Sequence, residues 1–330
     1  MIMSSTSSSN STGRASDDQT GKINDKSVGS CASCGIKEDD DIKLKICTAC
    51  KSVRYCGVEC QKKHRPKHKK DCKKRAAELR DELLFKQSES SHLGGCPICF
   101  LPHSLDITKS ILFQCCSQAI CTGCAVSHAL QRKAEGGEGD CPFCRSPRWK
   151  TDEQREKYTT KRLAVNCPVA LREMGVQCYQ RGKYTEAFDY LKRAADLGNA
   201  DAHFHMSVLY DSGNGVEKDK KKQIKHLETA AIGGHPGARQ FLSEIEFDNK
   251  KIDRAIKHLV IAGKLGHVTA IELLREFYAA KDEGILKKEV FAETLRGYQA
   301  ALEATKSRQR DEGDEFRKRV ALWKKGSPRK

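Results

Sequence analysis

The sequence has no long hydrophobic run and no export signal. No apolar stretch approaches the roughly 20 residues that cross a bilayer, and only 38% of the residues are hydrophobic against 32% that are charged. The start, Met1 to Met3 followed by a Ser/Thr/Asn run, lacks the basic and apolar regions of a secretory signal. We therefore predict no membrane span and no secretion, and expect a cytoplasmic or nuclear protein.

The usual signatures of covalent catalysis are also absent. No histidine and carboxylate stand at the spacing of a hydrolase motif. Gly213 and Gly215 do not make a phosphate-binding loop, because no strand precedes them and their spacing is wrong. The sequence therefore predicts no catalytic residue.

Cysteine, in contrast, is abundant and unevenly distributed. All but two of the 17 cysteines lie between Cys31 and Cys144. A reducing compartment does not favour disulfides, so repeated C-x2-C pairs there indicate metal binding. Cys167 and Cys178 follow alone and are expected to pack as small apolar groups. Metal should therefore stabilise the first half of the chain, and ordinary burial the second.

The first cysteine block offers eight metal ligands in four pairs. The pairs are Cys31-x2-Cys34, Cys47-x2-Cys50, Cys56-x3-Cys60 and His68-x3-Cys72. One C-x2-C turn fills half of a tetrahedral site, so two pairs must share each ion. His68 and Cys72 are four residues apart on an expected helix and can face one ion together. His64, four residues from Cys60 and from His68, is an alternative fourth ligand.

This array, with Arg54-Tyr55-Cys56 and the segment Pro66–Cys72, closely resembles the MYND zinc finger. In that family the ligand pairs interleave. The resemblance implies two zinc sites, one formed by Cys31, Cys34, Cys56 and Cys60 and the other by Cys47, Cys50, His68 and Cys72.

The second cysteine block contains Cys96-Pro-Ile-Cys99, Cys115-Cys116, Cys121-Thr-Gly-Cys124 and Cys141-Pro-Phe-Cys144-Arg145. It resembles a RING domain, which implies one zinc site from Cys96, Cys99, Cys121 and Cys124 and another that includes Cys116, Cys141 and Cys144. Gln118 stands where the family has a histidine ligand, and a neutral amide is a poor ligand for zinc. Cys115 is the expected substitute, with His128 or no fourth ligand as alternatives. Four zinc ions are expected, or three if this site is incomplete.

RING domains that act as ubiquitin ligases do no covalent chemistry of their own. They hold a ubiquitin-loaded conjugating enzyme so that its thioester is oriented for attack by a lysine. The resemblance implies contacts with that enzyme at Ile98, Pro142 and Arg145, all of which are suitable residues.

The net charge of +16 raises the hypothesis that the protein binds nucleic acid. Zinc binds thiolates, so four ions would lower the charge to about +9 or +10. The basic run from Lys62 to Arg75 has no interleaved aromatic residues that could stack on bases. A solvated helix face explains the run as well as a nuclear-import signal or a nucleic-acid patch does, and a nucleic-acid partner is not expected.

The second half of the chain repeats itself. The segments Leu191–Gly198, Leu227–Gly234 and Leu259–Gly266 superpose without gaps. A period of this size indicates stacked helix pairs, and the recurring glycine suits a left-handed helix C-terminal cap. One helix face is predicted from the apolar residues Tyr184, Ala187, Phe188, Leu191, Ala194 and Ala195.

The pattern from Ala202 to Asp219 resembles SEL-one-like repeats, and Gly182–Ala187 resembles the related tetratricopeptide repeat. Both are α-solenoids that bind other proteins. The third unit is degenerate, with Glu246 at the usual aromatic position. The predicted fold is multidomain: two small zinc-stabilised α+β modules followed by an all-α helical-repeat solenoid.

The predicted domain order has seven parts. They are a disordered Ser-rich head (1–30), a MYND-like double zinc finger (31–72), a helical linker (73–95), a RING-like double zinc module (96–145), a second helical linker (146–166), SEL-one-like and tetratricopeptide-like repeats (167–305) and a basic, frayed tail (306–330).

Three protein-interaction modules in one chain predict a multi-module binding protein. The sharper hypothesis is a RING-type ubiquitin ligase that docks a conjugating enzyme and selects a protein substrate through its repeats and MYND finger. The alternative is a non-catalytic zinc-dependent scaffold, and a nucleic-acid-associated regulator is third.

Overall fold

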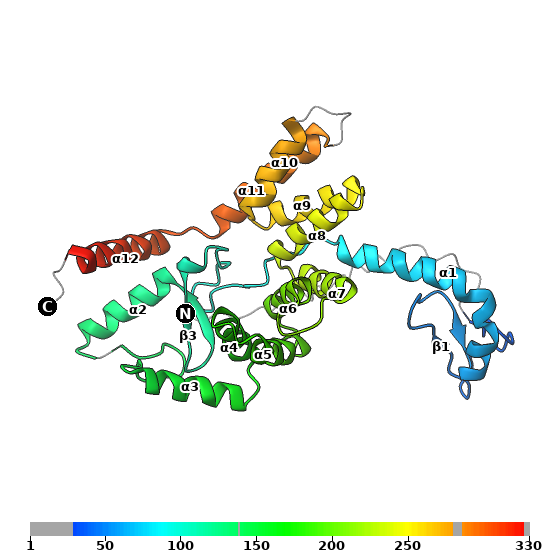
Figure 1. The fold of residues 1–330 in the computed structure, drawn as a ribbon, viewed down its shortest axis with the longest axis horizontal. Helices are drawn as coiled ribbons and strands as arrows, with labels where there is room; N and C mark the ends of the chain where they lie inside the picture. Colours follow the sequence, from blue (N-terminus) through cyan, green and yellow to red (C-terminus); the bar gives the residue numbers. More distant parts are fainter. Residues whose placement is uncertain (1–28, 138, 280–285, 327–330) are drawn as a thin grey trace, which may run out of the picture. The chain divides into compact units, whose positions relative to one another are not determined.

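The computed structural model describes residues 29–137, 139–279 and 286–326, with side chains described as far as residue 322. The predicted disordered head lies outside these residues except for its last two. The chain divides into two compact units, the first ending at Glu82 and the second beginning at Leu83 (Figure 1). None of the described helices is long and apolar enough to cross a membrane.

The first unit has a very small core. Strand β1 (Lys45–Ile46) pairs antiparallel with β2 (Arg54–Tyr55), and helix α1 (Val58–Leu84) follows, its last two residues belonging to the second unit. The fully buried cluster consists of Cys31, Leu44, Cys47, Cys50 and Tyr55. Most of these are cysteines, so apolar burial alone gives this unit little stability.

The second unit begins with the RING-like module. A short 3-10 helix η1 (Ile107–Lys109) leads into strand β3 (Ser110–Phe113), which pairs antiparallel with β4 (Gln118–Cys121) and is followed by helix α2 (Thr122–Ala134). The turn between the strands, residues 114–117, carries two of the cysteines. Ile120 is fully buried among the cysteines of this module and packs against Ile111 and Phe113.

An all-helical solenoid follows, as predicted. Helix α3 lies in the second predicted linker, and the next eight helices pack against their neighbours in chain order (Figure 1). Their bounds are α3 Asp152–Ala164, α4 Pro168–Gln180, α5 Tyr184–Asp196, α6 Ala200–Ser212, α7 Lys220–Ile232, α8 Pro236–Asp248, α9 Ile252–Lys264, α10 Val268–Ala279 and α11 Lys288–Ala304.

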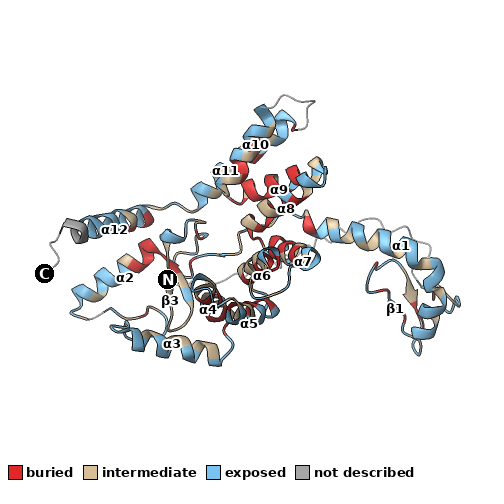
Figure 2. Cartoon of the chain, in the orientation of Figure 1, coloured by how far each residue is buried: buried red, intermediate tan, exposed pale blue. Residues whose placement is uncertain are grey.

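The repeated residues have the roles that the pattern predicts. In α5, Ala187, Leu191, Ala194 and Ala195 are buried, and Figure 2 shows buried residues along helices α4 to α9. The recurring glycines end their helices in the left-handed conformation, with φ of +81° at Gly198, +80° at Gly234 and +90° at Gly266. The degenerate Glu246 replaces an aromatic contact with an ion pair, its Oε1 accepting from Arg254 Nε at 2.7 Å.

The end of the first predicted linker is attached to the repeats. Leu84 is 1% exposed and packs with apolar residues of α7 and α8. Arg239 of α8, which has no exposed surface, donates to the carbonyl oxygen of Leu84 at 2.9 Å. This cap satisfies a carbonyl at the C-terminus of α1 that has no partner within the helix.

The prediction of a frayed tail is wrong for residues 308–322. Helix α12 (Arg308–Gly326) packs on α2 of the RING-like module. The two helices touch through glycines, since a Cβ atom on Gly313 would lie 2.7 Å from the Cα of Gly123. The tail was misread because its composition is highly charged and its contact surface contains glycine rather than a visible apolar stripe. Residues 327–330 lie outside the described part.

Candidate zinc centres

The structure brings together four sets of four ligand atoms. Within each set the atoms all lie within 4.8 Å of one another. The sets are Cys31, Cys34, Cys56 and Cys60; Cys47, Cys50, His68 and Cys72; Cys96, Cys99, Cys121 and Cys124; and Cys115, Cys116, Cys141 and Cys144. These are the groupings that the two family resemblances imply, with Cys115 in the disputed position.

The C-x2-C pairs at Cys31, Cys47, Cys96 and Cys141 share one turn geometry. In each, the first cysteine accepts at its carbonyl a backbone hydrogen bond from the residue after the second cysteine, at 2.8 to 3.0 Å. That residue is left-handed in every case, namely Gly35, Lys51, Phe100 and Arg145. The backbone of each turn therefore aims two sulfurs at one point, whatever the side chain of the left-handed residue.

The first site combines such a turn with the start of α1. Cys56 follows β2 and Cys60 lies in the first turn of α1. The Sγ atom of Cys56 is 3.6 Å from that of Cys34 and 3.5 Å from that of Cys60. Four sulfurs around a tetrahedral zinc ion are separated by about 3.8 Å, given Zn–S bonds of about 2.3 Å. These separations fit a bound zinc ion.

The second site uses one face of α1. His68 and Cys72, one helical turn apart, meet the pair Cys47 and Cys50, with 3.3 Å between Cys50 Sγ and His68 Nε2 and 3.8 Å between Cys47 Sγ and Cys72 Sγ. His64 does not join the set. Its Nδ1 lies 3.1 Å from the Tyr55 hydroxyl, and its ring stacks on His68. The geometry therefore supports His68 as the ligand, and His64 packs against the His68 ring without joining the site.

Hydrogen bonds in these turns favour the thiolate form. Burial opposes ionisation of Cys31, but backbone N–H groups of Cys34, Cys56 and Ser33 lower the pKa of its thiol to about 6. Cys47 behaves in the same way: burial raises its pKa, and the backbone of Cys50 and the His68 side chain lower it to about 6. One thiol of each site is thus biased towards the thiolate that zinc binds, whereas hydrogen bonds with neighbouring thiols raise the pKa of Cys56 and burial raises that of Cys72 to about 11.

The third site is the most enclosed. Cys96, Cys121 and Cys124 are at most 2% exposed. The backbone N–H groups of Cys121 and Cys124 point to the sulfurs of Cys96 and Cys121, at 3.5 and 3.4 Å. Cys99 Sγ lies 3.9 Å from Cys121 Sγ, so this set also matches tetrahedral separations.

The fourth site contains Cys115. Cys116 Sγ and Cys141 Sγ lie 3.6 Å apart, and Cys115 belongs to the same set. His128 instead places its Nε2 3.1 Å from Asp140 Oδ1, and Gln118 is exposed on β4. Among the described residues, the geometry therefore supports Cys115 rather than His128 as the fourth ligand.

A fifth group was not predicted and does not suit a metal. His92, Asp201 and His235 bring three potential ligand atoms together. His235 Nδ1 accepts from the backbone of Ala238 at 3.1 Å, so Nε2 carries the proton and donates to Asp201 at 3.3 Å. The Arg172 guanidinium also lies 3.2 Å from Asp201. The carboxylate already has a cation and a donor, and the group fastens residues from the linker and two repeats to one another.

The ionisation of this group agrees with that interpretation. Burial opposes charge on Asp201, but the hydrogen bond from His235 and the charge of Arg172 hold the pKa of this carboxyl well below its usual range. Burial lowers the pKa of His92 to about 4. No sequence pattern predicts that these three residues meet, because they come from three separate segments of the chain.

The three residues implied to contact a conjugating enzyme lie at the surface of the RING-like module. Ile98, between Cys96 and Cys99, is 40% exposed, and the Arg145 side chain is 69% exposed. Pro142 is half-buried, next to Phe143, which is 38% exposed. Two cysteine turns of this module thus expose apolar side chains.

Comparison with known families identifies two of the modules. The family model of the MYND finger matches residues 31–72, and that of the Sel1 repeat matches residues 168–199 and 200–235. The chain therefore contains a MYND zinc finger and Sel1 repeats, a protein-interaction architecture. The RING-like module is indicated by its cysteine groups.

Individual relatives resemble only parts of the chain. HcpC of Helicobacter pylori (strain J99), provisionally described as a beta-lactamase, is 37% identical over 60 residues, which are 18% of this chain and 21% of that protein. A Sel1 repeat protein from Oxalobacter formigenes has 24% identity and a TM-score of 0.40, covering 46% of this chain and 66% of its own. A protective antigen of uropathogenic Escherichia coli with an SLR fold has 18% identity and a TM-score of 0.37, covering 62% and 40%.

Proposed function

We propose that all four cysteine-rich sets hold zinc, two ions in the MYND finger and two in the RING-like module. Fifteen thiols and one imidazole form these sets, and such ligands suit tetrahedral zinc. Interleaving of the pairs ties together segments that share almost no apolar core. The ions would therefore be structural, and they would supply folding free energy to both modules.

Replacing Cys115 tests the fourth centre. We expect Cys115→Ser to lower the zinc content of the purified full chain from about four to about three equivalents, since a hydroxyl is a poor replacement for a thiolate. His128→Ala should leave the content unchanged, because His128 is engaged with Asp140. Elemental analysis of zinc per chain measures both. Loss of zinc from His128→Ala with none from Cys115→Ser would assign the ligand to His128.

We further propose that the RING-like module docks a ubiquitin-loaded conjugating enzyme, which makes the chain a RING-type ubiquitin ligase. The observation that carries this proposal is the pair of cysteine turns at Cys96 and Cys141, which present Ile98 and Phe143 at the surface. Each of these turns, held by metal, would offer a rigid apolar side chain to a partner. The module would contribute orientation of the thioester and no covalent step.

The MYND finger and the Sel1 repeats would then choose the substrate. Both are protein-interaction modules. Neither contains a ligand of the two sets in the RING-like module. Arg145 would act differently from Ile98: its exposed guanidinium can reach carboxylates or carbonyls of two partners at once. Substrate choice and enzyme docking would thus lie on separate parts of the chain.

Discharge of ubiquitin from a panel of charged conjugating enzymes onto free lysine tests the ligase proposal. We expect the zinc-loaded protein to accelerate discharge and Ile98→Ala to reduce the acceleration at least about fivefold, because truncation of a hot-spot residue at the centre of an interface costs more than about 1 kcal/mol. Arg145→Ala should also reduce it. Ile36→Ala is the matched control, since Ile36 is an isoleucine of similar exposure, 44%, in the other zinc module.

The alternative function predicts a different result. A zinc-dependent scaffold would bind all four ions and accelerate discharge with no enzyme of a broad panel. That outcome would rule out ligase activity and leave the interaction architecture as the function. An equal loss of activity in Ile36→Ala and Ile98→Ala would show that the effect does not arise from the predicted docking surface.

A further inference from the structure

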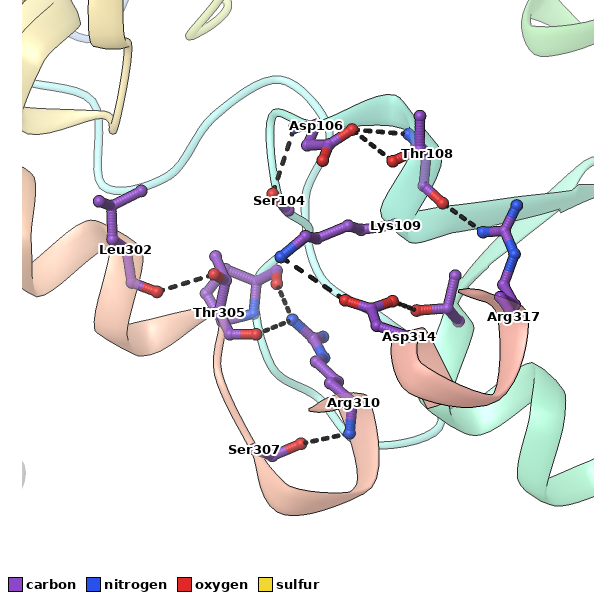
Figure 3. Close-up of polar contacts among 12 residues, drawn as sticks. Ser104, Asp106, Thr108, Lys109, Leu302, Thr305, Ser307, Arg310, Asp314 and Arg317 are labelled. Carbon is purple, nitrogen blue, oxygen red and sulfur yellow. Dashed lines mark hydrogen bonds and ion pairs between the residues drawn. The ribbon is translucent and has the colours of Figure 1, made fainter. Parts of the chain in front are cut away.

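Arg310, near the start of α12, is buried against the first loop of the RING-like module. Arg310 as a whole is 7% exposed. Its Nη1 donates to the carbonyl oxygens of Pro102 and Thr305, both at 2.7 Å, and its Nη2 donates to that of Leu101 at 3.0 Å. Nη2 also lies 3.4 Å from the Cys99 sulfur. Figure 3 shows the backbone nitrogen of Arg310 at Ser307 and its guanidinium at the carbonyl oxygen of Thr305.

Other contacts hold α12 in the same place. Asp314 accepts a hydrogen bond from Thr122 Oγ1 at 2.7 Å and forms an ion pair with Lys109 at 3.5 Å. Arg317 donates to the carbonyl oxygen of Thr108 (Figure 3). The close contact between Gly123 and Gly313 brings α12 onto the N-terminal turn of α2, beside Cys121 and Cys124.

The charge of Arg310 has no carboxylate partner among the described residues. Its acceptors are three carbonyl oxygens and a thiol sulfur. A buried guanidinium without a counter-charge is costly, because it loses its hydration and gains no ion pair. A zinc ion with four thiolates carries a net charge of about −2. Such a centre at Cys96, Cys99, Cys121 and Cys124 would supply the missing counter-charge.

We propose that Arg310 is the counter-ion of the zinc centre formed by Cys96, Cys99, Cys121 and Cys124, and that α12 is thereby an integral part of the RING-like module. This inference rests on the proposed zinc occupancy. Arg310 acts as a positioning residue: it holds a ligand thiolate by a hydrogen bond and fixes the loop that follows that ligand through the Leu101 and Pro102 carbonyls. Residues more than 200 positions apart in sequence would thus build one metal centre.

Zinc release from the full chain to a chromogenic chelator tests this role. We expect Arg310→Gln, which keeps hydrogen-bond donors but removes the charge, to release one of the four equivalents about tenfold faster than the wild type, because loss of an outer-shell partner typically lowers metal affinity about 10- to 100-fold. Arg310→Lys, which keeps the charge but loses the planar fork, should release it at an intermediate rate. Arg308→Gln is the control, because that side chain is 93% exposed.

The order of the rates separates a counter-charge from a merely structural contact. Release from Arg310→Lys as fast as from Arg310→Gln would overturn the counter-charge, and release from Arg310→Gln at the wild-type rate would overturn the whole inference. If Arg310→Gln is too unstable to load, Arg310→Lys compared with Arg308→Lys still gives a test, since a normal rate in both contradicts the proposal. Failure of the wild type to bind zinc in this module would instead refute the proposed function.

Discussion

Removal of zinc is expected to unfold both cysteine-rich modules while helices α4 to α9 stay folded. The MYND core consists largely of its own ligands, whereas the solenoid core contains apolar residues such as Leu171, Leu191 and Leu209. Structural zinc contributes about 10–16 kcal/mol in small zinc fingers, far more than such a core can replace. Addition of a strong chelator should therefore abolish amide protection in residues 31–60 and 96–134 and leave it in α4 to α9.

Hydrogen exchange measured by mass spectrometry follows these segments separately in the full chain. Cys31→Ser should reproduce the loss in the MYND finger alone, because it removes one ligand of the first site. Cys178→Ser is the matched control, since Cys178 is a buried cysteine, 4% exposed, that belongs to none of the ligand sets. Protection of the MYND segment that persists in chelator would show that zinc is not what stabilises it.

Truncation of Leu191 is expected to produce a large loss of stability in the repeats. Leu191 is 1% exposed, lies in the core cluster of α4 to α6 and packs so closely on α4 that a Cβ atom on Gly175 would lie 2.6 Å from its Cγ. Leu191→Ala leaves a cavity that this tight packing cannot close. We expect the free energy of unfolding to fall by about 2–5 kcal/mol.

Urea unfolding followed by the helical circular dichroism signal measures this loss. Leu197→Ala, at the end of the same helix, is the control, because Leu197 is 52% exposed and its truncation should cost less than about 0.5 kcal/mol. A further variant tests the contact itself: Gly175→Ala should destabilise the wild type, but should cost less in the Leu191→Ala background, where its methyl group has room. Equal costs in the two backgrounds would show that the two positions do not interact.

The zinc ligand sets show which parts of a metal site can be predicted from residue spacing alone. A C-x2-C pair directs two sulfurs to one point through a turn of its own backbone, and His68 and Cys72 share a helix face because they are one turn apart. Such relations span a few residues and follow from spacing. The sequence already favoured Cys115 over His128 as the fourth ligand, and the contact between His128 and Asp140 in the structure adds support to that prediction.

The packing of the C-terminal helix α12 could not be predicted from the sequence. Its local composition is charged, and the surface of α12 that meets α2 is built around Gly313. A helix that docks through a glycine and a buried arginine has no apolar stripe to reveal it. The attachment of Leu84 by Arg239 and the group around Asp201 were missed for another reason, because each depends on segments distant in the chain.

The sequence by itself determined the MYND finger, the helical repeats with their glycine caps and the groups of cysteines, because metal-ligand spacing and helical periodicity are local properties of the chain. Only the tertiary structure decided that α12 packs on α2, that Arg310 lies beside Cys99 and that the linker after α1 is held by the repeats. Arg239 and Arg310 are buried cations that meet carbonyl oxygens or a cysteine sulfur of distant segments, and nothing in either segment specifies its partner until the chain has folded.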